Sequence, residues 1–342
     1  MNGSRLRPLF RRAVQAAVFV LMVWEVYRFY RFVYYGAPKP DATDAFCPIV
    51  GTFDIIMKLK TGITDPFHPA AMAIILASVL TTLLVGKVFC SYVCVVGTFL
   101  DLLTGLRKRF INLKALSGLG KRLTSWRYYG LLDLLLRTPK FLIAGWFIYT
   151  MVRFPPQVMV AIAQTSNASA DISLFKWWVE LLKGEHPLAA AVMALILLFS
   201  LFIPRFWCRY LCPLGALYGV FNLFSLVRIR RDRCTCKGCG SCNGCFVGLK
   251  PSNMVEFNNT ECTACLDCSG KCPTASIAPE VLGRRFSPLL HALLSVALFF
   301  GFIGLFIHLG LWHSQAPKHL LALFLYRNGF VTPWVKETLG PM

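Results

Sequence analysis

Apolar residues gather in five stretches of the chain, and each is long enough, at roughly 20 residues, to cross the hydrocarbon core of a membrane as a helix. The first and third stretches also contain charged side chains, so we expect these two helices to face protein or the membrane interface. Two shorter amphipathic stretches, 53–60 and 174–183, are predicted to be interfacial helices. The predicted membrane spans are about 13–35, 68–88, 128–152, 187–207 and 287–311.

Composition supports a membrane protein. Of the 342 residues, 56% are hydrophobic and 15% are charged, which excludes a disordered chain and an ordinary soluble domain. The chain has 14 cysteines, but its long apolar runs exclude a disulfide-rich secreted scaffold. The net charge of +20 needs no nucleic-acid partner, because membrane proteins concentrate Lys and Arg on the cytoplasmic side.

The distribution of basic residues predicts the orientation. The N-terminal tail has 4 Lys and Arg residues, the connection 87–127 has 8 and the segment 204–286 has 11, against 3 in each remaining connection. The positive-inside rule therefore places the N-terminus and the cysteine-rich segment in the cytoplasm of a multi-pass protein of the bacterial inner membrane. The basic N-terminal tail lacks a signal-peptide cleavage site after an apolar core, so we expect an uncleaved anchor.

The chain contains an internal repeat with an offset of 118 residues. Each copy consists of a His-Pro pair, an apolar span and a Cys-x-x-x-Cys motif. Such a repeat predicts two pseudo-symmetric helix pairs in a membrane bundle. The matching residues are His68 and His186, Cys90 and Cys208, and Cys94 and Cys212.

A ferredoxin motif lies between the fourth and fifth apolar stretches. Four cysteines followed by Pro273 have the spacing C-x-x-C-x-x-C-x-x-x-C-P, which is typical of bacterial two-cluster ferredoxins. A zinc ribbon would need only pairs of cysteines. The motif consists of Cys262, Cys265, Cys268 and Cys272.

A second cysteine run, from Cys234 to Cys245, precedes this motif. Its last gap is one residue shorter than usual, and Cys234 is additional. We predict that Cys234 is either a spare thiol or a substitute for one ligand of the first cluster. The simplest partition assigns Cys236, Cys239, Cys242 and Cys272 to one 4Fe-4S cluster and Cys245, Cys262, Cys265 and Cys268 to the other.

The four cysteines of the repeat have three candidate roles. Cysteines at positions i and i+4 lie on one face of a helix, so the repeat could bring both pairs together at the cytoplasmic membrane boundary. There they could bind a metal or a further cluster, form a redox-active dithiol, or pack as small apolar side chains. The residues concerned are Cys90, Cys94, Cys208 and Cys212.

His68 and His186 precede the repeat cysteines by some 22 residues, roughly 33 Å along a helix. At the outer side of the membrane they could release protons from quinol, ligate a haem or cap a helix before the following proline. Cys47 lies in the first predicted outer loop, where it has no partner for a disulfide within the chain.

Three segments resemble the NapH/MauN-type membrane polyferredoxins and the membrane part of NosR, over about residues 10–280. The resemblance implies an all-α membrane bundle of about five helices with an inserted α+β ferredoxin domain that holds two 4Fe-4S clusters. It also implies a redox role beside respiratory or periplasmic enzymes. Val95 replaces the proline usual in that family. The segments read GKVFCSYVCVVGTFLDLL, RFWCRYLCPLGALYGVF and ECTACLDCSGKCP.

These observations predict three segments: a four-helix membrane domain at 1–225, a cytoplasmic ferredoxin domain at 226–285, and a fifth span with an external tail at 286–342. The expected function is electron transfer between the quinone pool or a cytoplasmic carrier and a periplasmic cytochrome or reductase, within a membrane complex. One alternative is a thiol-based copper reductase or assembly factor for a respiratory metalloenzyme. Another is a scaffold whose clusters only stabilise the fold. No motif indicates catalysis apart from redox chemistry.

Overall fold

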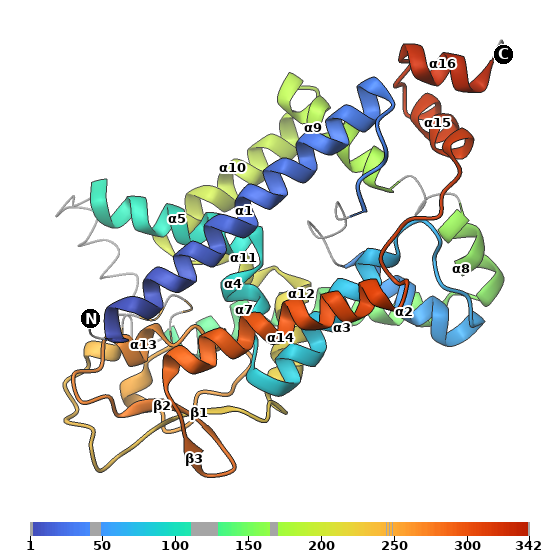
Figure 1. Cartoon of the computed structure of the whole chain (residues 1–342). Coiled ribbons are helices and arrows are strands. Elements are labelled where there is room, and N and C mark those ends of the chain that lie inside the picture. The colour runs from blue at the N-terminus through green and yellow to red at the C-terminus, as the bar shows by residue number, and fades with distance from the viewer. Residues whose placement is uncertain are drawn as a thin grey trace. The chain divides into compact units, whose positions relative to one another are not determined.

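The computed structural model describes residues 3–41, 49–110, 129–164, 170–243, 245, 247 and 249–340. Helices dominate, and one lies over each of the five apolar stretches of the sequence (Figure 1). Their bounds are α1 Gly3–Tyr35, α3 Pro69–Val85, α7 Tyr129–Arg153, α10 Pro187–Phe202 and α14 Pro288–His308.

Length and apolar composition single out α14 among the described helices as able to cross a membrane by itself. Helices α9, Ala170–Lys183, and α10 pass the same test only as a pair, and the pair is bent by 87°. Helix α3 is apolar but short, with 17 residues. The number of five membrane spans therefore remains a prediction from the sequence.

The chain divides into two compact units, and the division falls within helices α1, α3, α7, α10 and α14. All the cysteines of the described residues belong to unit 1. Unit 1 consists of Met1–Val18, Ser78–Phe147 and Ala194–Phe300, and unit 2 of Phe19–Ala77, Ile148–Met193 and Gly301–Met342.

The internal repeat has the same local backbone in both copies. In each, an apolar helix is followed by a short helical segment and then by a further helix that begins just after the second cysteine. The amide N–H of Cys94 donates to the carbonyl of Phe89, and that of Cys212 donates to the carbonyl of Trp207, both at 2.9 Å. The helices that complete the two copies are α4 Phe89–Tyr92, α5 Val95–Phe110, α11 Phe206–Tyr210 and α12 Pro213–Asn222.

Two glycines at matching positions allow this turn. A β-carbon at Gly97 would lie 2.7 Å from the carbonyl oxygen of Cys90, and one at Gly215 would lie 3.1 Å from that of Cys208. The first distance is shorter than a carbon–oxygen contact can be, so the helix after the second cysteine needs glycine to lie against the first cysteine.

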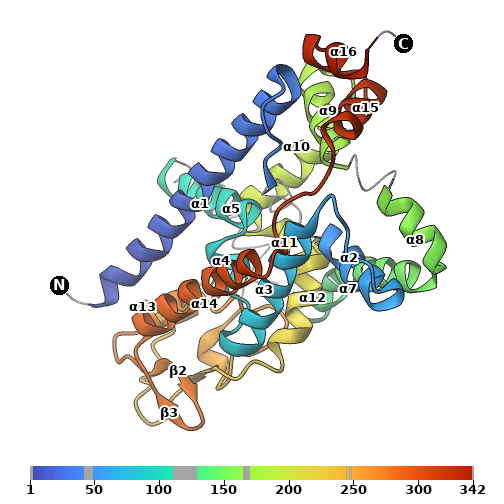
Figure 2. The same cartoon turned by 45° about the vertical axis from the view of Figure 1, so that its right-hand side comes forward.

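A small antiparallel sheet completes the cysteine-rich segment of unit 1. Its strands follow the order β1-β2-β3, and Ile229 of β1 lies opposite Pro279 of β2. In Figures 1 and 2 the sheet lies beside α13. The elements are β1 Arg228–Arg231, β2 Ile277–Val281, β3 Arg284–Arg285, the 3-10 helices η3 Ser241–Asn243 and η4 Pro251–Asn253, and α13 Asp267–Gly270.

The sheet and the first copy of the repeat share one hydrophobic core. Val88 and Tyr92 pack in the same cluster as Ile229, Phe257 and Leu266, and all five are at most 4% exposed. The chain also enters β1 along the end of α3, where the amides of residues 226 and 227 donate to the carbonyls of residues 83 and 84. The ferredoxin-like segment therefore belongs to the same compact unit as the Cys-x-x-x-Cys motifs.

Unit 2 has two apolar clusters. Phe53 and Met57 of α2 pack with Met159 of α8, and Phe29 and Phe32 of α1 pack with the C-terminal helices. Figure 2 shows α2 beside α8 and α15 beside α16. Both stretches predicted as amphipathic are helical, in α2 and α9. The remaining helices are α2 Val50–Thr61, α8 Pro156–Ile162, α15 Lys318–Arg327 and α16 Pro333–Leu339.

We expect Gly97→Ala to lower the free energy of unfolding by about 1 to 3 kcal/mol, because the added methyl group overpacks against the Cys90 carbonyl. Gly105→Ala on the same helix is the matched control, since a β-carbon there meets no atom within 4 Å. The control should be neutral or slightly stabilising. The measurement is thermal unfolding of the solubilised protein by circular dichroism, and equal midpoints for the two variants would contradict the prediction.

Candidate functional site

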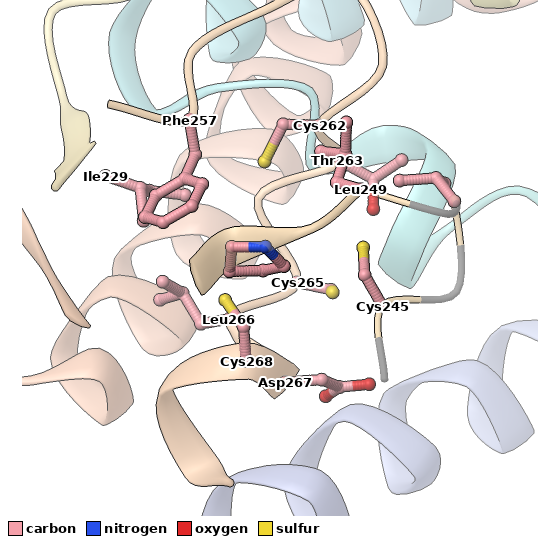
Figure 3. A pocket seen from close by; sticks show the side chains of 12 residues that line it. Ile229, Cys245, Leu249, Phe257, Cys262, Thr263, Cys265, Leu266, Asp267 and Cys268 are labelled. Atoms are coloured by element: carbon pink, nitrogen blue, oxygen red, sulfur yellow. The ribbon is translucent and has the colours of Figure 1, made fainter. Parts of the chain in front are cut away.

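Four cysteines surround one pocket in unit 1. The sulfur atoms of Cys245, Cys262, Cys265 and Cys268 point toward the same space, as Figure 3 shows. Apolar side chains such as those of Ile229, Phe257 and Leu266 form much of the remaining wall. Four sulfurs converging in an apolar, largely enclosed pocket fit a thiolate-bound iron–sulfur cluster.

Unusual backbone conformations shape the loop that presents three of these sulfurs. Ala264 has φ of 51° and Leu266 has φ of 57°, in the left-handed region that non-glycine residues seldom adopt. The side-chain oxygen of Asn259 accepts hydrogen bonds from the amides of Glu261 at 2.9 Å and Cys262 at 2.8 Å. Contacts within the protein therefore hold the loop in a strained, specific conformation.

A second set of four cysteines lies in the same segment. The charge of Cys272 acts on Cys239 and Cys242, and that of Cys236 also acts on Cys242. Burial raises the pKa of the Cys272 thiol, but hydrogen bonds with the hydroxyls of Ser276 and Thr274 lower it to about 7. Cys272 Sγ lies 3.1 Å from Ser276 Oγ. Cys236, Cys239, Cys242 and Cys272 are the set that the sequence assigns to the first cluster, and this assignment stays a prediction.

Cys234, the additional cysteine of the first run, is exposed. Its backbone amide donates to the carboxylate of Asp232 at 2.9 Å. No described contact joins its sulfur to the second set. This position agrees with the interpretation of Cys234 as a spare thiol, which stays a prediction.

The two cysteine pairs of the repeat come together. Cys208 lies close enough to Cys212, Cys94 and Cys90 for charge on one sulfur to act on another, and Cys94 also interacts with Cys212. The described residues contain no group of three His, Cys, Asp or Glu side chains close enough for a single metal ion. We call these four cysteines, Cys90, Cys94, Cys208 and Cys212, the membrane quartet.

The loop that carries Cys262 is docked on both copies of the repeat. Lys87 Nζ donates to the carbonyl of Thr260 at 3.2 Å, and Asn222 Nδ2 donates to that of Asn259 at 2.7 Å. Gly219 of α12 lies so close that a β-carbon would be 2.6 Å from the Thr260 oxygen. The Cys262 loop therefore packs directly against segments of both copies of the repeat.

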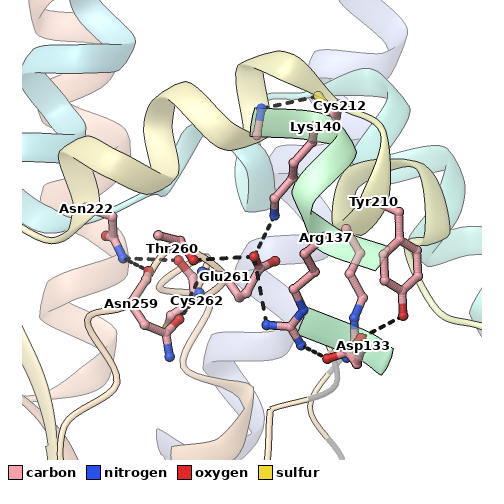
Figure 4. A network of polar contacts seen from close by, with 12 residues as sticks. Asp133, Arg137, Lys140, Tyr210, Cys212, Asn222, Asn259, Thr260, Glu261 and Cys262 are labelled. Atoms are coloured by element: carbon pink, nitrogen blue, oxygen red, sulfur yellow. Dashed lines mark hydrogen bonds and ion pairs between the residues drawn. The ribbon is translucent and has the colours of Figure 1, made fainter. Parts of the chain in front are cut away.

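Buried ion pairs surround this site, as Figure 4 shows. Lys140 Nζ lies 2.5 Å from the carboxylate of Glu261, the residue before Cys262, and the two side chains are 0% and 4% exposed. Asp133 accepts hydrogen bonds from Arg209 at 2.6 Å and from the Tyr210 hydroxyl at 2.8 Å. The third apolar stretch carries Asp133 and Lys140 because the polar side of its helix faces these partners.

Another buried network links the repeat to the beginning of α1. Arg205 donates two hydrogen bonds to Asp101, from Nε at 2.8 Å and from Nη2 at 2.7 Å. Arg11 lies 3.6 Å from Asp101 and 3.3 Å from Asp267, which precedes Cys268. Gln15 Nε2 donates to the carbonyl of Ser91 at 3.0 Å.

The sequence predictions missed Lys87 and Arg205. These residues match each other at the same offset of 118 and lie three positions before Cys90 and Cys208. Both are nearly inaccessible, at 3% and 1% exposed. The repeat alignment contained this signal, because a basic residue recurs at one position of both copies next to the cysteines.

The two histidines lie in unit 2 beside carboxylates of the same helix, α9. His68 is buried, with its Nε2 atom 3.7 Å from Asp171, whereas the half-buried His186 has its Nε2 atom 3.0 Å from Glu180. The two carboxylates are nine residues apart, roughly 13 Å along a helix. That separation does not favour two axial ligands of one haem. Cys47 lies outside the described residues.

Comparison with known proteins identifies the family. The model of a 4Fe-4S binding domain matches residues 67–114 and 185–232, which are the two copies of the repeat. YccM of Escherichia coli, named as an electron transport protein, is 29% identical over 93% of this chain and 90% of its own length. The ferredoxin-type protein NapH of Haemophilus influenzae is 26% identical over 60% of this chain and 67% of its own. These similarities support a ferredoxin-type protein of the NapH/MauN kind.

Other relatives carry related names. MauN of Paracoccus denitrificans, named as a methylamine utilization ferredoxin-type protein, is 28% identical over 51% of this chain and 53% of its own length. No solved structure matches the chain. Similarity to these proteins and to the 4Fe-4S binding domain supports 4Fe-4S clusters and an electron-transfer role. The matched residues contain the membrane quartet and end before the two ferredoxin sets.

We expect Lys140→Met to lower the free energy of unfolding by about 3 kcal/mol or more, because it leaves the carboxylate of Glu261 buried without its nearest cation. Adding Glu261→Gln to this variant should recover part of the loss. The control is Lys176→Met, which removes a lysine paired with Glu180 whose side chain is 40% exposed, and it should change stability much less. Chemical denaturation of the solubilised protein measures these differences, and wild-type stability of Lys140→Met would contradict the prediction.

Proposed function

We propose that this protein is an iron–sulfur electron-transfer protein of the bacterial inner membrane. The observation that carries the proposal is the convergence of Cys245, Cys262, Cys265 and Cys268 on one apolar pocket. A 4Fe-4S cluster, when bound, takes up or releases one electron at a time. Cys236, Cys239, Cys242 and Cys272 would hold a second cluster.

We further propose that the membrane quartet holds a third 4Fe-4S cluster. Support comes from the family model of a 4Fe-4S binding domain, which matches both segments that contain these cysteine pairs. Mutual proximity of the four sulfurs supports it as well. Bound to iron, the four sulfurs would be thiolates, so their negative charge needs compensation in the protein.

The charges around the site fit such groups. Five basic side chains form ion pairs with four carboxylates in this part of unit 1, and the buried Lys87 adds a further positive charge. An excess of positive charge favours thiolates and reduced clusters over neutral thiols. The residues in these pairs are Arg11, Arg137, Lys140, Arg205 and Arg209 with Asp101, Asp133, Glu261 and Asp267.

The proposed setting is a multi-pass membrane protein whose N-terminus and cysteine-rich segment face the cytoplasm. Its partners would be a quinone or a cytoplasmic electron carrier on one side of the reaction and a periplasmic cytochrome or reductase on the other. The bias of basic residues toward the N-terminal tail and the segments 87–127 and 204–286 supports this orientation.

His68 is the best candidate for handling protons at a quinone site. Oxidation of one quinol releases two electrons and two protons, so a quinol site needs a nearby proton acceptor. His68 lies 3.8 Å from Asp65 and 3.7 Å from Asp171, and Asp171 also lies 2.8 Å from Lys39. Such a chain of titratable groups could receive a proton and pass it on.

Iron analysis tests the cluster assignment. Wild-type protein purified without oxygen should contain about twelve irons and equal acid-labile sulfide, four for each cluster. Cys262→Ser and Cys236→Ser should each lose about four irons, and Cys90→Ser or Cys208→Ser should lose the four of the membrane quartet. Cys234→Ser is the matched control and should keep them all.

Other metal contents would contradict the proposal in distinct ways. About eight irons that survive Cys90→Ser would remove the third cluster only. Copper bound to the membrane quartet in place of iron would favour a thiol-based metal reductase or assembly factor. Zinc without iron would overturn the electron-transfer function.

His68→Asn should slow cluster reduction by a quinol analogue about tenfold or more, because general-base assistance is lost. Reduction by dithionite, which needs no proton acceptor, should be unchanged. The control is His319→Asn, which alters an exposed histidine of α15 in the same unit. Stopped-flow absorbance measures both reactions, and equal quinol rates for wild type and His68→Asn would exclude this role.

A further inference from the structure

Lys87 is a buried cation whose described partners are backbone carbonyls. Lys87 is 3% exposed. Its Nζ atom donates to the carbonyl of Gly215 at 2.8 Å and to that of Thr260 at 3.2 Å. Within the part of the chain that the structure describes, no carboxylate forms an ion pair with it. These hydrogen bonds use two of the three ammonium donors, but carbonyls supply no full negative charge.

The matching residue of the second repeat is different. Arg205 occupies the position equivalent to Lys87 and has a full counter-charge, because both oxygens of Asp101 accept its hydrogen bonds. Lys140, the other buried lysine of this region, is paired with Glu261. Among the described residues, Lys87 therefore differs from its neighbours because no carboxylate pairs with it, although burial makes an uncompensated charge costly.

The carbonyls that hold Lys87 belong to two different cysteine sites. Gly215 follows Cys212 of the membrane quartet by three residues, and Thr260 precedes Cys262 by two. Burial raises the pKa of the Cys262 thiol to about 12, and the positive charge of Lys87 opposes this effect. The same charge acts on Cys212. Lys87 thus lies where negative charge at either site would compensate it.

We propose that Lys87 is the shared buried counter-cation of two neighbouring iron–sulfur centres, one on the membrane quartet and one on the set that contains Cys262. This inference rests on the proposed function. Lys87 is a positioning residue that sets reduction potential and binds no iron itself. Its charge favours the reduced, more negative state of each centre, so the centres share one source of electrostatic stabilisation.

Variants that remove this charge in different ways test the inference. Lys87→Gln keeps donors for the two carbonyls, Lys87→Met keeps most of the side-chain volume, and Lys87→Arg keeps the charge. The control is Lys250→Met, because Lys250 is exposed while its neighbours Leu249 and Pro251 line the Cys262 pocket. Water screens the charge of Lys250, so its loss should have little effect.

The readouts are iron content and midpoint potentials from redox titration followed by electron paramagnetic resonance. We expect Lys87→Gln and Lys87→Met to lower the one-electron reduction equilibrium constant of the Cys262 centre about tenfold, a shift of about 59 mV to more negative potential. The membrane centre should shift in the same direction. Lys87→Arg and Lys250→Met should stay close to wild type in both potentials.

Two results would overturn the inference and leave the proposed function intact. One is a wild-type potential in a Gln or Met variant that retains its full iron content. The other is an Arg variant whose potential falls as far as that of the neutral variants, since its charge is retained. Wild-type protein without iron would instead overturn the proposed function, and the inference with it.

Discussion

Compensation of buried charge is the constraint on which unit 1 depends. Five basic side chains and four carboxylates form ion pairs around the cysteines, and the lone buried Lys87 leaves positive charge in excess. Removing one partner of such a pair is far more costly than removing an exposed pair. The network is thus suited to a site whose own groups are negative.

Close backbone approach gives the network its geometry. Gly219 lets the Cys262 loop lie against α12, and Gly97 lets α5 turn back over Cys90. Once the loop is docked, Asn222 and Lys87 can reach its carbonyls. The ferredoxin-like segment is therefore built onto the repeat and shares its core, which is a suitable arrangement for short electron-transfer distances between neighbouring centres.

Cysteine spacing in the sequence predicts which residues bind the clusters. The spacing of Cys262 to Cys272 predicts a two-cluster ferredoxin, and in the structure Cys245, Cys262, Cys265 and Cys268 line one pocket. The assignment of the eight ligands to two clusters stays a prediction. The charges in the third apolar stretch were expected to face protein or the membrane interface. Spacing could not identify Glu261 as the partner of Lys140, because 121 residues separate them along the chain.

The sequence by itself determined the helical stretches, the repeat and the resemblance to ferredoxin-type proteins, because each follows from local periodicity or from a motif. Only the tertiary structure decided which charges are compensated. Arg205 and Lys87 are equivalent in the repeat, yet one meets Asp101 and the other meets two carbonyls. Packing decides which buried side chains from distant segments become partners, so no local sequence pattern predicts the pair.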